Sequence, residues 1–323
     1  MKKFKDFCCM TQKGVKAYMA KYLVSKKYEV INEDGFLYAK GDVPVLLVAH
    51  MDTVHKEQCT TVIRTGNIFS SPQGIGGDDR CGIFIIANLV KEYHCSVLLL
   101  EDEEIGTVGA RKFTKTDYIN NLDVNFMIEF DRKGNNDAVF YSCDNKDFTD
   151  YVLDNTGYKL ASGSWTDISV LMPASKLCGV NLSCGYYNPH TVSEYVNYDE
   201  MMDTISAAEV LIKAECEKPF EYVAKTYKPS TYSSNYSSYG NYSYDDYPYY
   251  NDYGYSHNNE KDSVRTRAKK DVTLELTVTI TNNEGQEEYL FAEGRTKGEC
   301  WLDLFTSYPG VCFNDIIEYE FVS

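Results

Sequence analysis

Val43-Pro44-Val45-Leu46-Leu47-Val48-Ala49 is a continuous apolar run that leads directly into His50-Met51-Asp52. A run of this length without polar alternation is typical of a strand that is covered on both faces of its sheet. Its one proline is the second residue, where a strand tolerates a missing N–H donor. We therefore expect a central strand that presents His50 and Asp52 at its carboxyl end.

Strand and helix patterns alternate on both sides of this run through the first 220 residues. Strands are predicted at residues 28–31, 36–39, 43–49, 96–100, 125–130 and 180–184. Helices are predicted at residues 12–26, 80–93, 108–113, 148–155, 167–172 and 199–217. This alternation predicts an α/β fold, in which a doubly wound mixed sheet is flanked by helices.

The rest of the chain falls into two segments that differ in amino-acid composition. We therefore expect three parts. Residues 1–221 form the large α/β domain. Residues 222–268 contain twelve of the 28 tyrosines, interleaved with Ser and Asn, and predict a low-complexity linker. Residues 269–323 include a clean apolar–polar alternation up to residue 281 and predict a small β-rich domain.

The net charge predicts which partners the protein can bind, and the cysteines predict the cellular compartment. The chain has 32 Lys and Arg against 48 Asp and Glu, a formal charge of −16. This charge repels phosphate backbones and anionic lipids, so we expect neither a nucleic-acid nor a membrane partner. No apolar run approaches the ~20 residues of a membrane helix, and the first residues lack the apolar stretch of a signal peptide. Eleven scattered cysteines without a Cys-x-x-Cys pair indicate reduced thiols and predict a cytoplasmic protein.

Histidines and carboxylates follow the predicted strands or open the helix that comes next. They are His50, Asp52, Asp78, Asp79, Glu103, Glu104, Asp131 and His190. Loops at the carboxyl edge of such a sheet meet where α/β proteins bind ligands. Two imidazoles and three carboxylates suit a pair of divalent Zn, Mn or Co ions. Of the adjacent Glu103 and Glu104, one can be a ligand and the other a general base toward water.

Four patterns, taken in order, resemble those of the co-catalytic zinc exopeptidase clan of metallopeptidases (families M20, M28 and M42). They are His-x-Asp-x-Val at 50–54, Gly-x-Asp-Asp-Arg-x-Gly at 76–82, Asp-Glu-Glu-Ile-Gly-x-x-Gly-Ala at 102–110 and Asn-Pro-His-Thr-x-x-Glu at 188–194. The resemblance covers roughly residues 40–217, and it implies that residues 1–221 are a catalytic domain that binds two divalent ions, Zn with Co or Mn as alternatives.

The resemblance also implies a role for each matching side chain. His50 and Asp131 would bind one ion, Glu104 and His190 the other, and Asp78 would bridge them. Glu103 would be the general base, and Asp52 would orient His50 through its second ring nitrogen.

The sequence alone leaves open whether Asp78 or Asp79 bridges the ions. Asp78 is preferred because Arg80 then matches the family's basic residue two positions on. In the family, the peptide that matches Asp78-Asp79 is typically cis.

The interval between the last two ligands departs from the larger members of the clan. Only 59 residues separate Asp131 from His190, too few for an inserted lid domain of roughly 100 residues, so the resemblance is to the compact members. We expect Tyr186 or Tyr187 to donate a hydrogen bond to the oxyanion that forms during hydrolysis. We expect Arg132 to pair with a carboxylate of the substrate.

Two further features are interpreted as structural. The segment Ser-Gly-Ser-Trp-Thr-Asp at 162–167 favours a helix N-cap at Thr166 or Asp167, with substrate contact as the alternative. His55, His94 and His257 have no partners in the pattern and are expected at the surface.

The expected function is a metal-dependent hydrolase that cleaves peptide or amide bonds, an aminopeptidase or a dipeptidase. One alternative is a deacylase of N-acyl amino acids with the same chemistry. Another is a non-catalytic interaction protein whose C-terminal region binds a protein partner or a second copy of the chain. A complete ligand set with Glu103 beside it speaks against the last alternative, because a scaffold has no physical need for either.

Overall fold

The computed structural model describes residues 1–225, 274–281, 287–294 and 316–322. The chain divides into two compact units. The larger one contains all described residues up to Lys225, and the smaller one contains the three C-terminal strands. The predicted linker at 222–268 lies outside the described residues from residue 226 onward, so its character stays a prediction.

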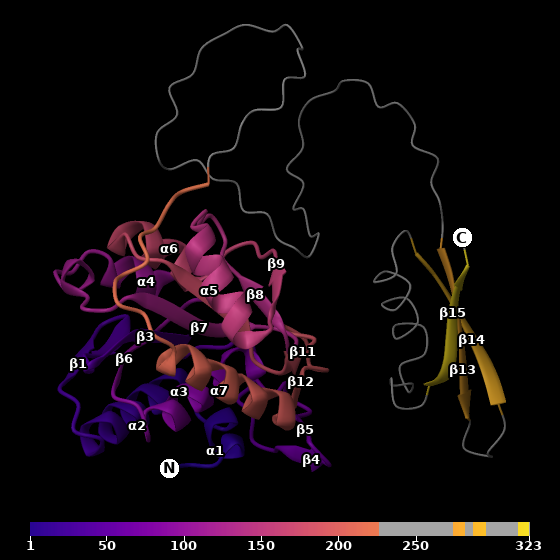
Figure 1. The fold of residues 1–323 in the computed structure, drawn as a ribbon. Helices are drawn as coiled ribbons and strands as arrows, with labels where there is room; N and C mark the ends of the chain where they lie inside the picture. Colours follow the sequence, from indigo (N-terminus) through magenta and orange to yellow (C-terminus); the bar gives the residue numbers. More distant parts are fainter. Residues whose placement is uncertain (226–273, 282–286, 295–315, 323) are drawn as a thin grey trace, which may run out of the picture. The chain divides into compact units, whose positions relative to one another are not determined.

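The larger unit is built on an eight-stranded sheet in the order β1-β2-β6-β3-β7-β10-β8-β9 (Figure 1). Its strands are β1 (Val30–Glu33), β2 (Phe36–Ala39), β3 (Val43–His50), β6 (Cys95–Leu100), β7 (Phe126–Arg132), β8 (Asp137–Val139), β9 (Lys159–Ala161) and β10 (Gly179–Ser183). The four central strands run parallel, whereas β2 and β8 pair antiparallel with β6 and β10. The predicted mixed α/β sheet is confirmed.

The strand β3 lies inside this sheet, between β6 and β7. Leu47 pairs with Val97 on one side and with Ile128 on the other, and all three side chains are fully buried. Because helices cover both faces here, β3 buries every residue from Val45 to His50, which explains the apolar run in the sequence.

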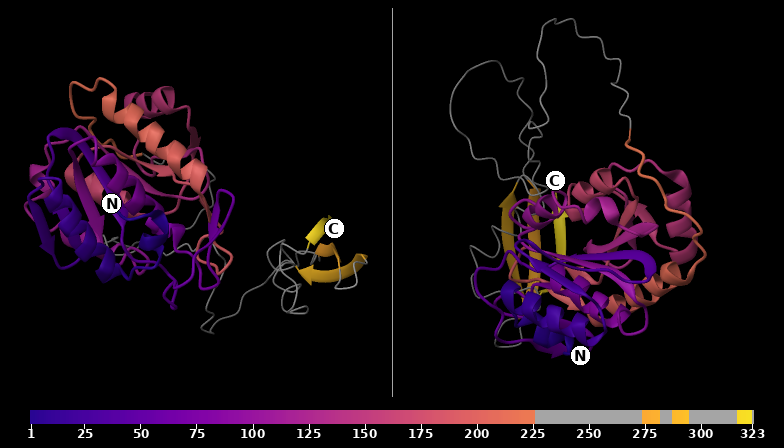
Figure 2. Two further views of the ribbon diagram at one scale, coloured as in Figure 1. Left: turned by 90° about the horizontal axis from the view of Figure 1, so that it is seen from below. Right: turned by 90° about the vertical axis from the view of Figure 1, so that its left-hand side faces the viewer.

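Helices lie on both sides of the sheet (Figure 2). They are α1 (Phe4–Cys8), α2 (Gln12–Ser25), α3 (Gly77–Leu89), α4 (Val108–Phe113), α5 (Lys146–Thr156), α6 (Asp167–Ser175) and α7 (Tyr198–Lys213), with a 3₁₀ turn η1 (Ile119–Asn121). The helices α3 and α7 contact each other on one side, and α4 and α6 contact each other on the other side (Figure 1). Among the described residues, no helix combines the length and apolar character that crossing a membrane requires.

A second sheet, which the sequence patterns did not predict, brings two distant segments together. Its order is β11-β12-β5-β4, and its strands are β4 (Ile63–Thr65), β5 (Ile68–Ser70), β11 (Tyr186–Tyr187) and β12 (Tyr195–Asn197). Strands of two or three residues are too short to show a period of two. His190 lies in the connection between β11 and β12.

The interval from Asp131 to His190 is described in full and contains no inserted domain. It runs through β8, α5, β9, α6, β10 and β11, all of which belong to the two sheets and the helices already described. This agrees with the compact plan that the short spacing predicts.

The smaller unit contains a three-stranded antiparallel sheet in the order β14-β13-β15. Its strands are β13 (Leu274–Thr281), β14 (Glu287–Gly294) and β15 (Ile316–Val322). The strand β13 lies in the alternating segment that ends at residue 281, so the β-rich character predicted for this region is confirmed.

Truncating Leu47 to Ala should lower the free energy of unfolding by about 2–5 kcal/mol, because it opens a cavity between the helix layers. Denaturant unfolding followed by circular dichroism measures this change. The control is Leu160→Ala in β9, whose side chain is 63% exposed and which should change the same quantity by less than about 0.5 kcal/mol. Equal effects of the two substitutions would contradict the central position of β3.

Candidate metal centre

The five predicted ligands meet at the carboxyl edge of the parallel strands. His50 ends β3 and Asp131 lies near the end of β7, while Glu104 follows β6 and Asp78 lies in the first turn of α3. Because β6, β3 and β7 are parallel neighbours, their carboxyl ends open on the same edge. His190 reaches this edge from the connection between β11 and β12.

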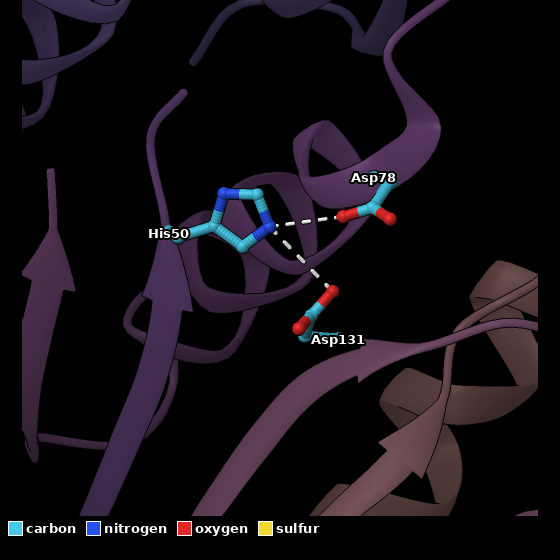
Figure 3. A group of neighbouring side chains, drawn as sticks. All are labelled: His50, Asp78 and Asp131. Carbon is cyan, nitrogen blue, oxygen red and sulfur yellow. Dashed lines mark hydrogen bonds and ion pairs between the residues drawn. The ribbon is translucent and has the colours of Figure 1, made fainter. Parts of the chain in front are cut away.

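The first group of possible ligand atoms consists of His50, Asp78 and Asp131 (Figure 3). His50 Nε2 lies 2.9 Å from Asp78 Oδ1 and 3.6 Å from Asp131 Oδ1. All three atoms lie within 4.8 Å of one another, which is close enough for one cation to contact them all. The His50 ring is only 1% exposed, so this group is buried.

The second group consists of Asp78, Glu104 and His190. His190 Nε2 lies 3.3 Å from Asp78 Oδ2 and 3.2 Å from Glu104 Oε2. The His190 side chain is 42% exposed, so this group borders solvent. Asp78 thus offers one carboxylate oxygen to each group, as a carboxylate shared by two ions must do.

Asp79 has different partners from Asp78. Its Oδ2 accepts a hydrogen bond from the His50 backbone N–H at 3.2 Å, and its Oδ1 accepts one from Gly82 at 2.8 Å. The peptide between Asp78 and Asp79 is cis, as the resemblance implies. Asp78 belongs to both groups of ligand atoms and Asp79 to neither, which favours Asp78 in the alternative that the sequence left open.

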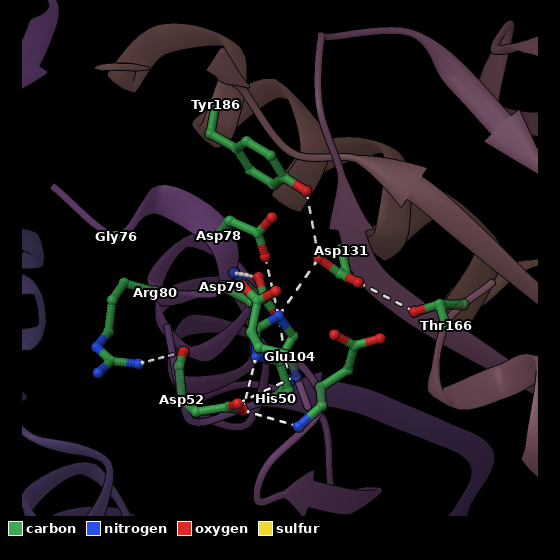
Figure 4. Close-up of polar contacts among 12 residues, drawn as sticks. His50, Asp52, Gly76, Asp78, Asp79, Arg80, Glu104, Asp131, Thr166 and Tyr186 are labelled. Atoms are coloured by element: carbon green, nitrogen blue, oxygen red, sulfur yellow. Dashed lines mark hydrogen bonds and ion pairs between the residues drawn. The ribbon is translucent and has the colours of Figure 1, made fainter. Parts of the chain in front are cut away.

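Asp52 connects His50 to the loop after β6, which contains Glu103 and Glu104 (Figure 4). Asp52 Oδ1 lies 3.1 Å from His50 Nδ1. The two Asp52 oxygens also accept hydrogen bonds from the backbone N–H groups of Glu103 at 3.0 Å and Glu104 at 3.1 Å. Asp52 thus fixes the His50 ring through Nδ1 and turns Nε2 toward Asp78 and Asp131.

Glu103 is a carboxylate beside the two groups that belongs to neither. Burial raises the pKa of Glu103 to about 10; the charges of Asp131 and Asp167 act in the same direction, and His50 opposes them. Its neighbours are therefore arranged so that this carboxyl readily binds a proton.

The donor set fits divalent cations. Glu104 Oε1 is buried and has no hydrogen-bond partner within the described part of the chain. Burial raises the pKa of Asp131 to about 7 and that of Asp167 to about 8. Carboxylates in such surroundings are costly to ionise unless a positive charge lies close by. Imidazole and carboxylate ligands together suit Zn, Mn or Co.

The structure separates the three residues that were predicted to contact substrate. Tyr186 donates its hydroxyl proton to Asp131 Oδ1 at 3.2 Å (Figure 4). Tyr187 instead donates to Glu200 at 2.6 Å, and Arg132 pairs with Asp137 at 3.2 Å. Of these residues, Tyr186 is therefore the one that directly contacts a ligand of the first group.

The N-cap interpretation of the segment at 162–167 is confirmed. Thr166 is the N-cap residue of α6, and its backbone N–H donates to Ser169 Oγ at 3.2 Å. The Thr166 hydroxyl donates to Asp131 Oδ2 at 3.0 Å, a contact that the sequence analysis missed (Figure 4). The next residue, Asp167, is buried, and neither of its oxygens has a hydrogen-bond partner among the described residues. The only sequence signal for these contacts was a polar turn before an apolar helix.

The surface position predicted for His55 is wrong. Its side chain is 10% exposed, and Nε2 lies 2.9 Å from an oxygen of the buried Glu194. His55 and Glu194 thus form a buried pair, which the distance between them along the sequence gives no reason to expect. His94 is 35% exposed and pairs with Asp42, while His257 lies outside the described residues.

Comparison with known proteins shows which solved structures share this fold. No protein-family model matches the sequence, and no curated protein matches it in sequence. Aminopeptidase PepT from Bacillus cereus superposes with a TM-score of 0.54 at 14% identity, over 65% of this chain and 96% of that one. A tripeptidase from Staphylococcus aureus gives 0.54 at 12% identity over the same shares. An aminopeptidase from the archaeon Desulfurococcus kamchatkensis gives 0.51 at 13% identity, over 65% and 93%.

The larger unit therefore shares its fold with these two aminopeptidases and the tripeptidase, which agrees with the fold that the resemblance in the sequence motifs implies. At these identities the likeness concerns the fold alone, so the chemistry must be argued from the side chains.

Replacing His50 with Ala should reduce the zinc bound per chain, because it removes one ligand of the first group and leaves Asp78 and Asp131 without their imidazole partner. Elemental analysis after equilibration with zinc and removal of free metal measures the stoichiometry. His94→Ala is the matched control, since His94 lies apart from both ligand groups. Unchanged zinc in His50→Ala would count against this ligand set.

Proposed function

We propose that this chain is a metal-dependent hydrolase that removes residues from the ends of peptides, as an aminopeptidase or a peptidase of short peptides. The observation that carries the proposal is the pair of ligand groups that share Asp78, with the carboxylate of Glu103 beside them. The fold shared with two aminopeptidases and a tripeptidase supports the same class of reaction.

His50 and Asp131 would hold one divalent ion, Glu104 and His190 the other, and Asp78 both. Zinc is the first candidate because it favours imidazole and carboxylate ligands and accepts low coordination numbers. Ions bound there would supply Lewis-acid polarisation of the scissile carbonyl and lower the pKa of a water molecule.

Glu103 is the residue proposed to move the proton. A general base takes a proton from the attacking water and returns it to the leaving amine. Burial raises the pKa of Glu103, and cations bound by the two neighbouring groups would lower it toward neutrality, where a carboxyl can both take up and release a proton. One carboxylate, that of Asp52, contacts both the ring of His50 and the backbone N–H of Glu103. It therefore fixes the position of the proposed base relative to a proposed ligand.

Tyr186 is the proposed donor to the oxyanion. Burial raises the pKa of the Tyr186 phenol well above its usual range, so the hydroxyl keeps its proton and can donate it as a hydrogen bond. Its present acceptor is Asp131, one of the ligand residues.

Replacing Glu103 with Gln should lower kcat by about 10²–10⁴-fold, the usual contribution of a general base, and leave bound zinc unchanged. The assay uses the zinc-loaded and the cobalt-loaded full chain with free and N-acylated di- and tripeptides and with aminoacyl fluorophores. Glu92→Gln, an exposed glutamate just after α3, is the control. Wild-type turnover in Glu103→Gln would contradict the mechanism.

The same substrate panel tests the reaction class. Cleavage of peptides with a free amino terminus supports the proposal. Hydrolysis of N-acyl amino acids alone would replace it with the deacylase alternative. Absence of hydrolysis of every substrate by the metal-loaded chain would overturn it.

Asp78→Asn and Asp79→Asn should have different consequences. Asp78→Asn should lower bound zinc at both ions, because one carboxylate serves both groups. Asp79→Asn should keep zinc bound but lower the free energy of unfolding by about 1–3 kcal/mol, since an amide NH₂ would face one of two backbone N–H donors. Loss of zinc in Asp79→Asn only would reverse the assignment.

A further inference from the structure

Glu194 binds the backbone that carries Asp78. Its Oε1 accepts a hydrogen bond from the Asp78 backbone N–H at 2.9 Å, and its Oε2 accepts one from Gly76 at 2.8 Å. The side chain is fully buried, so these bonds are made without competition from water. One carboxylate thus fixes the backbone at Asp78, the residue that both ligand groups share, and two residues before it.

His55 supplies the third donor to this carboxylate. Its Nε2 lies 2.9 Å from Glu194 Oε2, the oxygen that also accepts from Gly76. A buried carboxylate is stable when several N–H groups donate to it. His55 therefore fixes the orientation of Glu194 and contributes to offsetting the cost of burying it.

The glycines of the loop at 74–77 allow the neighbouring side chains to approach its backbone closely. A Cβ atom on Gly74 would lie 2.2 Å from the His55 ring, and one on Gly77 would lie 3.2 Å from Glu194 Oε1 and 2.7 Å from Val196. Gly76 has a φ of +65°, a conformation that other residues adopt only with strain. The close approach of His55 thus explains Gly74, the backbone conformation explains Gly76, and the close approach of Val196 explains Gly77.

Glu194 also connects two of the three segments that supply the second ligand group, those of Asp78 and His190. It lies four residues after His190, just before β12, and its backbone N–H bonds to Thr191 at 3.2 Å. The same residue therefore belongs to the loop of His190 and holds the backbone of Asp78.

We propose that Glu194, oriented by His55, is a positioning residue that sets Asp78 relative to His190 and so tunes the affinity of the centre for its metal. This inference rests on the proposed function only in assuming that the two groups bind ions. Residues that orient ligands from behind typically change metal affinity by 10–100-fold when replaced.

The test measures zinc affinity by competition with a chromophoric chelator, on the full chain and without reference to turnover. Glu194→Gln turns one acceptor oxygen into a donor, so its zinc dissociation constant should rise by about 10–100-fold. Glu200→Gln is the control, because Glu200 bonds to Tyr187 and not to this loop. A wild-type dissociation constant in a folded Glu194→Gln would overturn the inference.

A second pair of variants acts through His55, at the edge of the network. His55→Leu removes the donor and should raise the zinc dissociation constant by up to about tenfold, whereas His55→Gln keeps an N–H donor and should restore much of the affinity. A purely structural role would lower the unfolding free energy of the metal-free chain in both variants and leave zinc affinity unchanged, which would also overturn the inference.

The two proposals fail in different ways. If the wild-type chain binds no zinc or cobalt, the proposed function fails and this inference fails with it. If the wild type binds zinc and hydrolyses peptides while Glu194→Gln and His55→Leu bind zinc equally well, only the positioning role is overturned.

Discussion

The concentration of carboxylates at the carboxyl edge of β3, β6 and β7 is the constraint on which the rest of the site depends. Asp78, Glu104 and Asp131 lie within reach of two imidazoles, and burial raises the pKa of Glu103, Asp131 and Asp167. So much negative charge away from water is stable only with protons or cations among it. Cations bound there, as proposed, would offset this charge.

The acidic residues divide into two sets by the donors they accept. Asp52, Asp79 and Glu194 accept hydrogen bonds from backbone N–H groups and so fix the loops. The contacts of Asp78, Glu104 and Asp131 at the centre are with side chains. Carboxylates saturated by backbone donors shape the site, whereas those with available oxygens can bind ions. This division explains why adjacent Asp78 and Asp79 have different proposed roles.

The small second sheet positions two residues of the proposed site. Pairing of β12 with β5 and β11 anchors the connection that carries His190 and Glu194 against a segment more than a hundred residues earlier. Without this anchoring, the second ligand group would depend on an unsupported loop. Patterns of two or three residues cannot predict such pairing, because a short strand has no measurable period.

The sequence by itself determined the α/β class, the central place of the strand at 43–50, and the ordered set of motifs that points to the candidate ligand residues. These follow from local chemistry: apolar runs without alternation are buried on both faces, and loops after parallel strands share one edge. Only the tertiary structure decided which of Asp78 and Asp79 faces both groups, that Tyr186 and not Tyr187 contacts Asp131, and that His55 is buried against Glu194. Those outcomes depend on side-chain direction and on contacts between distant segments, which spacing along a chain does not encode.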